Sequence, residues 1–157
     1  MSVSVNWKGP QFIDEAGDAF RDGYEAVGLF YQGQVQRELR KNRSIAKPGT
    51  APGARTGTLA RSVVIDRSRL NADNPSVRVG TNLVYARIHE FGGIIKPKKA
   101  KWLAFFVGKG AARRFIRTKK VTMPARPYFR PTFNRNRQKF IDVFAANVRK
   151  SLEKAVI

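Results

Sequence analysis

The segment Asn82-Leu-Val-Tyr-Ala-Arg-Ile-His-Glu-Phe-Gly-Gly93 decides how the two halves of this chain fit together. It contains the only histidine of the protein, ends in a Gly-Gly pair, and is mostly apolar within a very basic chain. Strand-like sequences lie on both sides of it, so we expect it to link two halves of one fold. We expect Tyr85, Ile88 and Phe91 to face the core.

Length and charge limit the class of protein. The 157 residues indicate a single domain, 1–157, and the net charge of +20 is far larger than the magnitude of about 2–8 that solubility needs. The charge therefore predicts an anionic partner. The chain has no cysteine, which excludes disulfides and thiolate sites. The apolar run at 102–107 is too short to span a membrane, and we expect no secretory signal and no membrane contact.

Helical periodicity marks both ends of the chain. Apolar residues spaced three and four apart predict one long amphipathic helix from about Pro10 to Asn42. Acidic residues crowd its first half and basic residues its end, as the helix dipole favours, and its glycines allow close approach of a neighbour. A second helix is expected from an N-cap at Thr132 to about Ala155.

The middle of the chain predicts two antiparallel hairpins. Leu59–Asp66 should pair with Ser76–Gly80, and residues 96–120 should form a second hairpin with a turn near Gly108–Arg114. The second hairpin carries ten Lys and Arg residues and no acid, and its apolar runs are expected to face the core. The loop at 47–57 is expected to be mobile, and Met123–Pro131 to run extended. The fold class is therefore α+β, with a small, largely antiparallel sheet of about four strands packed with the long N-terminal helix and the C-terminal helix.

No set of residues with the spacing of a catalytic or metal site is complete. One histidine without cysteines does not make a usual zinc site, and neither glycine-rich loop has the P-loop pattern. A serine triad through His89 stays open, although no nucleophile-elbow pattern is present. Glu90, Asp66 and Asp73 are the acids near the middle of the chain. We expect that the protein is not an enzyme and binds no cofactor.

A structural role accounts better for Glu90. An acid in so basic a chain has many cationic partners, and Arg126 lies in a segment stiffened by prolines. A bidentate carboxylate–guanidinium pair would fasten that segment to the 82–93 stretch. The prediction is that substitutions at Glu90 and Arg126 are less than additive in their effects on stability.

Four phrases occur in order along the middle of the chain: Thr56-Gly-Thr-Leu-Ala-Arg-Ser62, Val79-Gly-Thr-Asn82, Tyr85-Ala86 with His89-Glu-Phe-Gly-Gly93, and Met123-Pro-Ala-Arg-Pro-Tyr-Phe129. Together they resemble the virion-morphogenesis, or tail-completion, proteins of long-tailed bacteriophages, the group to which minor tail protein Z of phage lambda and protein G of phage Mu are related. The resemblance covers roughly residues 56–133.

The resemblance implies a structural virion protein of the phage neck or tail top, assembled in the host cytoplasm. It implies a ring, hexameric in expectation, that completes the tail and helps to join it to the DNA-filled head, next to the tail-terminator ring and the head-closure or connector proteins. The positions that match the shared phrases are read as fold and ring-building residues: Tyr85, Glu90, Phe91, Gly92, Pro124, Arg126, Pro127 and Phe129.

The basic charge is not explained by the resemblance. We expect the basic hairpin and the preceding loop to bind partners through Arg55, Lys98, Lys99, Lys101, Lys109, Arg113, Arg114 and Arg117. Acidic neighbouring proteins are the favoured partners, because a strongly basic lumen would retard passing DNA, and genomic DNA is the second. The alternative function is nucleic-acid binding, with Trp102, Phe105, Phe106 and Phe115 near the charges, although these aromatics are strung like core strands.

Overall fold

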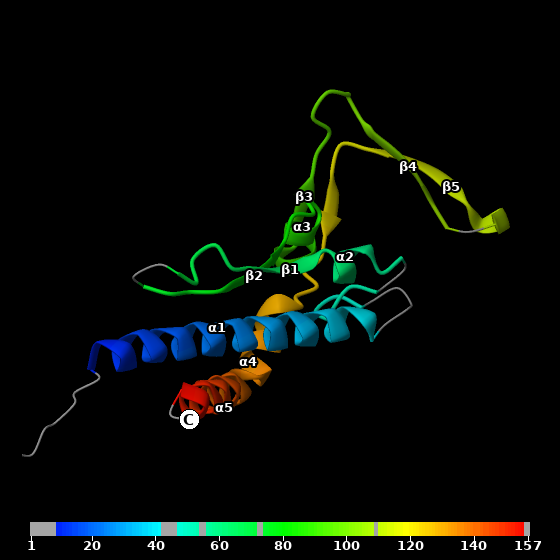
Figure 1. Ribbon diagram of the computed structural model, residues 1–157. Helices are drawn as coiled ribbons and strands as arrows, with labels where there is room; N and C mark the ends of the chain where they lie inside the picture. The colour runs from blue at the N-terminus through cyan, green and yellow to red at the C-terminus, as the bar shows by residue number, and fades with distance from the viewer. Residues whose placement is uncertain (1–8, 42–46, 54–55, 72–73, 109, 156–157) are drawn as a thin grey trace, which may run out of the picture.

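The computed structural model describes residues 9–41, 47–53, 56–71, 74–108 and 110–155. The fold is α+β, as predicted, with a long helix at each end of the chain and short antiparallel strands between them. The strands form three separate two-stranded ladders rather than one sheet of about four strands. Figure 1 shows the two long helices together at one side of the molecule and the β4–β5 ladder projecting from the other.

Helix α1 runs over Gly9–Arg40 and packs along α5, Arg137–Ala155, which confirms the long N-terminal helix. Gly23 makes this contact close, because a Cβ there would lie 2.8 Å from the Phe144 ring. Gly28 likewise allows a close contact between α1 and the chain around the first hairpin, because a Cβ there would lie 2.7 Å from Val77. The two glycines thus let α1 be covered on two sides.

The first predicted hairpin is confirmed. Strand β1, Val63–Asp66, pairs antiparallel with β2, Arg78–Thr81, from Val63↔Thr81 to Asp66↔Arg78. The ladder follows the short helix α2, Thr58–Arg61, and lies against α1. Two glutamines of α1, Gln32 and Gln36, donate to the carbonyl of Val63 at 2.8 and 3.0 Å.

The 82–93 segment folds as helix α3, Ala86–Phe91, followed directly by strand β3, Gly93–Ile95. Strand β3 pairs antiparallel with β6, Val121–Met123. This three-residue ladder was not predicted, since strands so short show no alternation, and its members lie far apart in the sequence.

The second predicted hairpin is also confirmed. Strand β4, Leu103–Val107, pairs antiparallel with β5, Arg114–Thr118, and the 3₁₀ turn η1, Gly110–Ala112, lies between them. The expectation that its apolar residues face the core is wrong. Phe106 and Phe115 are each 56% exposed, because the hairpin leaves the body of the molecule and nothing in the described chain covers it. We call residues 96–120 the arm.

The C-terminal helix differs from its prediction. Helix α4, Phe129–Arg135, begins before Thr132, and only Asn136 separates it from α5. Thr132 is therefore not an N-cap but a buried residue inside α4. Pro131 is accommodated in the first turn, where a missing N–H breaks no intrahelical hydrogen bond, so the extended segment ends earlier than expected.

The core lies where α1, α2, β1 and the proline segment meet. Its buried members are Val35, Leu39, Ala51, Ala60, Val63 and Tyr128. Ala51 comes from the predicted loop at 47–57, so this loop contributes a residue to the core. The N–H of Gly49 donates to the carbonyl of Ala125 at 2.9 Å, which fastens the loop to the proline segment. The predicted mobility of 47–57 stays a prediction.

Candidate interaction surface

Glu90 joins α3 to the start of α4. Its carboxylate accepts hydrogen bonds from the backbone N–H groups of Tyr128, Phe129 and Arg130 at 2.8, 3.0 and 3.0 Å. The first N–H groups of a helix have no intrahelical partner, and the helix dipole favours an anion beside them. Glu90, although only 8% exposed, is thus satisfied as a cap supplied by a distant segment.

Two backbone contacts reinforce this cap. The N–H of Arg126 donates to the carbonyl of His89 at 2.6 Å. Gly92 ends α3 at φ 69° and ψ −173°, a region that is almost exclusive to glycine. A Cβ there would lie 2.8 Å from the nitrogen of Ala125 and 2.9 Å from the carbonyl oxygen of Met123. We call these contacts between residues 86–92 and 123–130 the clasp.

The clasp confirms that Glu90 ties the proline segment to the 82–93 stretch, but through the backbone N–H groups. The pairing of its carboxylate with the Arg126 guanidinium stays a prediction. Tyr85 and Phe91 do not face the core, as they are 43% and 63% exposed, while Ala86 and Glu90 are buried. A six-residue helix has one narrow inner face, and residues four apart occupy it.

The remaining motif positions surround the clasp. Pro124, Pro127 and Phe129 are partly buried. The hydroxyl of Tyr31, on α1, donates to the carbonyl of Phe129 at 2.9 Å, and the two rings meet edge to face at 6.2 Å between centroids. Burial and the charge of Glu90 raise the pKa of Tyr31 to about 12, so its hydroxyl remains a donor at ordinary pH. The clasp is thereby connected to the longest helix.

The surroundings of His89 favour its neutral form. Burial first, and the charge of Arg126 second, lower the pKa of His89 below its ordinary value. Its Nδ1 is buried and has no hydrogen-bond partner among the described residues. Among all the residues that the structure describes, no group of three or more His, Asp or Glu side chains is placed to hold a metal ion.

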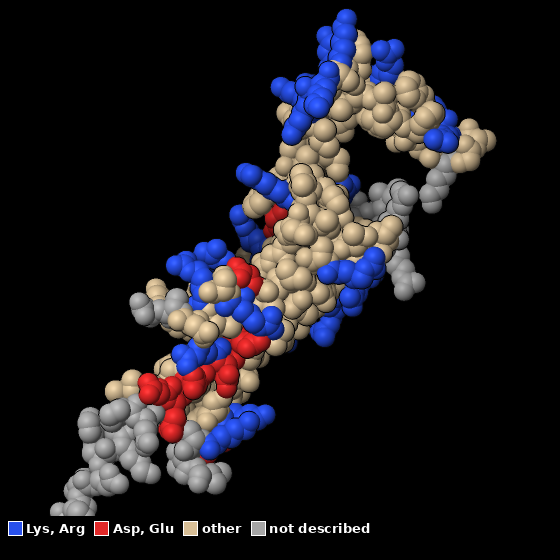
Figure 2. All heavy atoms as spheres, turned by 45° about the horizontal axis from the view of Figure 1, so that its top comes forward, with Lys and Arg blue, Asp and Glu red and all other residues tan. Residues whose placement is uncertain are grey.

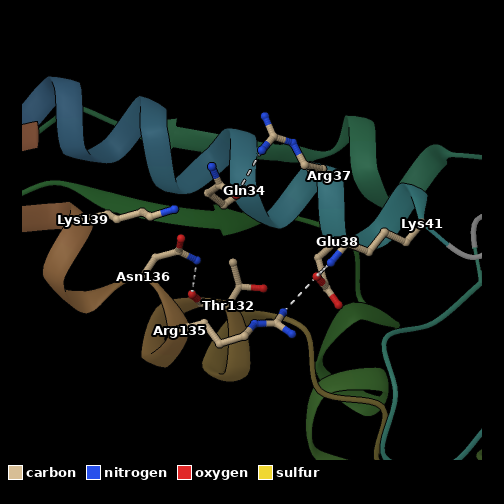
Figure 3. Close-up of a pocket in the computed structure, with 8 residues that line it drawn as sticks. All are labelled: Gln34, Arg37, Glu38, Lys41, Thr132, Arg135, Asn136 and Lys139. Atoms are coloured by element: carbon tan, nitrogen blue, oxygen red, sulfur yellow. Dashed lines mark hydrogen bonds and ion pairs between the residues drawn. The ribbon is translucent and has the colours of Figure 1, made fainter.

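A polar cavity of about 300 Å³ lies between α1, α4 and the start of α5 (Figure 3). It is lined by Gln34, Arg37, Glu38, Lys41, Thr132, Arg135, Asn136 and Lys139. The Glu38 carboxylate contacts Lys41 at 2.7 Å and Arg135 at 2.9 Å. Burial alone would raise the pKa of Glu38, but these hydrogen bonds hold it below its ordinary value. The cavity is thus an ion-pair network that joins α1 to α4, with a carboxylate already opposing its cations.

The arm is apolar on both faces. Cross-strand neighbours Phe105↔Ile116 lie on one face, and Phe106↔Phe115, with ring centroids 5.1 Å apart, lie on the other. Because a ladder of two strands has two edges, each strand also carries backbone groups that no other described strand pairs with. An isolated two-stranded hairpin is marginally stable in water. These features are typical of a surface that another molecule covers.

Cations decorate the same ribbon. The guanidinium carbon of Arg113 lies 4.0 Å from the centroid of the Phe106 ring, and the charges of Arg117 and Lys119 lie 5.7 and 5.3 Å from that of Trp102. Of the predicted partner-binding residues, the structure exposes Lys98, Lys99, Lys101, Arg113, Arg114 and Arg117. Arg55 and Lys109 lie outside the described residues.

Acidic side chains gather elsewhere. Five of the eleven acids lie between residues 14 and 25 of α1, namely Asp14, Glu15, Asp18, Asp22 and Glu25. Figure 2 shows acidic side chains towards one end of the molecule and the Lys and Arg of the arm at the other. Sequence reasoning assigned these acids to the helix dipole alone, although their spacing within twelve residues also signals an acidic surface. We call them the acidic patch.

A family model described as the phage virion morphogenesis family matches residues 9–149. The chain belongs to the phage virion morphogenesis family. Membership places it among the proteins that build the phage virion, as the sequence resemblance predicted. A search of curated proteins and a search of solved structures each found no significant match.

The match to the phage virion morphogenesis family runs from the first turn of α1 into the last turns of α5. The clasp, the arm and the acidic patch therefore all lie inside the family region. The closer relation to the lambda and Mu proteins stays a prediction. No helix in the described part of the chain combines the length and apolar character of a membrane span.

Proposed function

We propose that this protein is a structural component of the phage neck or tail top, where copies form a ring that completes the tail and joins it to the head. The observation that carries the proposal is the arm, a ribbon with exposed apolar side chains on both faces and a dense positive charge. Such a ribbon is stabilised when a neighbouring subunit or protein covers it. The expected ring is hexameric, and we assign it no catalytic step.

Charge supports anionic neighbours for this ring. Each copy carries +20, and self-association alone does not reduce that charge. Acidic surfaces on a tail-terminator ring or on head-closure and connector proteins would balance it, and genomic DNA in the lumen is the second choice. The protein would then work inside the virion neck after assembly in the host cytoplasm.

Removal of the protein tests the proposal. Infected cells that lack it should contain filled heads and separate tails, counted by electron microscopy, with at least about a tenfold loss of joined particles. Complementation with the native chain should restore joining. Complementation with Phe106→Ser/Phe115→Ser should not, even if this variant is as abundant and as stable as the native chain. Normal infectious particles without the protein would overturn the proposal.

A control separates this role from catalysis. His89→Ala, judged by the same particle count, should join heads to tails in proportion to its folded fraction. Loss of joining by a His89 variant that folds and enters particles normally would instead revive a catalytic function.

Nucleic-acid binding is the second candidate, and the exposure of the arm favours it. The aromatics were expected in the core, whereas the structure puts Phe106 and Phe115 at the surface beside cations. Stacking on aromatics within a positive groove is how proteins bind single strands. A titration with DNA at two salt concentrations tests this function in the native protein and in Arg114→Glu/Arg117→Glu. If the arm binds DNA, the affinity of the native protein should fall steeply with salt, and the variant should lose this salt-dependent binding.

A further inference from the structure

The molecule carries two unlike surfaces that complement each other. We propose that the arm of one copy binds the acidic patch on α1 of the next copy. This inference rests on the proposed ring and names the contact that would build it. Figure 2 shows the two surfaces at opposite ends of the molecule, so one copy is not placed to join its own arm to its own patch.

The acidic patch combines charge with exposed apolar side chains. Ile13 and Phe20 are 68% and 47% exposed among the acids. Asp14 and Glu15 make no ion pair or hydrogen bond within the described residues. The other three acids already have partners: Asp18 pairs with Arg21, Asp22 accepts from Ser151, and Glu25 pairs with Arg67. Asp14 and Glu15 are thus the acids of the patch that are available to a partner.

The arm supplies the matching chemistry. Arg114 and Arg117 stand on β5 on either side of Phe115 and Ile116, so each face of this strand carries one cation and one apolar side chain over these four residues. Guanidinium groups bind carboxylates through paired N–H groups, and the apolar side chains of the arm would cover Ile13 and Phe20. Both members of the contact are therefore mixed surfaces of opposite charge.

The placement of these surfaces determines the kind of assembly. A contact between two different patches of the same chain is heterologous, and repeated copies close into a ring when the rotation between them allows it. Like charges oppose a two-fold contact of arm with arm or of patch with patch. Arm-to-patch contacts can instead repeat from copy to copy, as a ring requires, or be made reciprocally in a dimer, and the number of linked copies distinguishes the two.

Nucleic acid is the less suitable occupant of the arm. Phosphates would neutralise its cations, and Phe106 or Phe115 could stack on bases. However, Val107 and Ile116 are also exposed, and aliphatic side chains offer no stacking surface. DNA would also leave the exposed Ile13 and the neighbouring acids without a role. A second copy accounts for both surfaces at once.

Cross-linking in assembled particles tests the contact directly. The chain has no cysteine, so introduced thiols report only the chosen sites. Arg114→Cys/Asp14→Cys, treated with a short bismaleimide, should give a ladder of covalent multimers that ends at the ring size. Each single variant should stay monomeric on the gel, and Arg114→Cys/Gln138→Cys, whose second thiol lies at the opposite end of the helix pair, is the matched control. Dimers from Arg114→Cys alone would overturn the proposal in favour of an arm–arm contact.

Charge reversal provides an independent test. Arg114→Glu/Arg117→Glu and Asp14→Lys/Glu15→Lys should each lower the yield of joined particles at least about tenfold, since like charges then face each other. Co-expression of the two variants should restore joining, because each reversed arm meets a reversed patch. If the patch variant joins normally while the arm variant loses DNA binding, the arm serves nucleic acid. Rings that form without the cross-link overturn this contact alone, whereas heads and tails that join without the protein overturn the proposed function.

Discussion

The clasp and the arm differ in whether their side chains make their contacts within the chain or lie exposed to solvent. In the clasp, Glu90 is buried and each of its hydrogen bonds ends on the same chain. In the arm, Phe106 and Phe115 are exposed, and the surrounding segment 96–120 contains ten Lys and Arg residues and no acid. The difference teaches that the family phrases at residues 85–93 and 123–129 specify the fold, whereas the region between them, which carries no such phrase, is the one that we propose to face other molecules. Substitutions should therefore separate stability from assembly.

Gly92→Ala should have the largest effect on stability. Its backbone conformation is close to glycine-only, and the added Cβ would meet backbone atoms of Ala125 and Met123. We expect a loss of about 3 kcal/mol in the free energy of unfolding, measured by urea denaturation. Gly33→Ala is the control, because no atom lies within 4 Å of a Cβ there, and it should be neutral or stabilising by up to ~1 kcal/mol.

Glu90→Gln should lower stability by about 2 kcal/mol, since an amide cannot accept all three N–H hydrogen bonds and lacks the charge that complements the helix dipole. Glu153→Gln, an exposed acid on α5, is the control and should change stability by less than ~0.5 kcal/mol. Combination with Arg126→Gln in a double-mutant cycle tests the predicted carboxylate–guanidinium pair. Strictly additive effects of the two substitutions would rule out the carboxylate–guanidinium pair but not the capping of the backbone N–H groups by Glu90.

Tyr31→Phe should cost about 1 kcal/mol, because it deletes the hydrogen bond to Phe129 but keeps the ring contacts with Phe133 and Phe140. The measurement is thermal unfolding against Tyr24→Phe, a tyrosine of the same helix for which the structure shows an aromatic contact with Phe144. Equal shifts for the two variants would show that α1 is not fastened to the clasp through Tyr31.

Acid should weaken the clasp through His89. Since the folded protein holds the pKa of His89 below its ordinary value, the unfolded chain takes up a proton first as the pH falls below ~6.5. Stability conferred by the neutral ring is therefore present above that pH and declines between it and the lower folded pKa. His89→Gln should flatten this part of the pH profile of unfolding. His89 is the only histidine, so the difference between the two profiles isolates it.

Phe106→Ser/Phe115→Ser should have the smallest effect on stability, below ~0.5 kcal/mol, while abolishing the joining of heads and tails. Phe140→Ser, at a residue only 9% exposed, is the matched change in the core and should cost about 3 kcal/mol or more. An arm variant that unfolds as readily as the core variant would erase the distinction between the two regions.

Much of the fold follows from local patterns. Helical spacing locates α1, and apolar runs bounded by turn residues locate both hairpins with their antiparallel pairing. The N-cap at Thr132 is wrong because Glu90, from a segment about 40 residues away in the chain, caps the helix and lets it begin at Phe129. Nothing local to Thr132 contains that information.

The arm shows another limit of sequence patterns. Leu103-Ala-Phe-Phe-Val107 has no polar alternation, which is typical of a strand covered on both faces. The pattern predicts burial but does not say which molecule provides it. In the described chain Ala104, Phe105, Phe106 and Val107 are exposed, so the expectation of a core strand is wrong. For Glu90 the sequence did predict the partner segment, residues 123–131. The structure adds that the hydrogen bonds come from backbone N–H groups of that segment.

The short β3–β6 ladder has a practical consequence for protein engineering. Together with the hydrogen bond from Arg126 to His89, it closes the chain at the foot of the arm, so that residues 96–120 leave and return at one fixed point. A segment anchored in this way can be shortened to a tight turn, or exchanged for that of another family member, without disturbing the rest of the fold. The partner that we propose for the arm could then be changed by transplanting one insert while the scaffold stays constant.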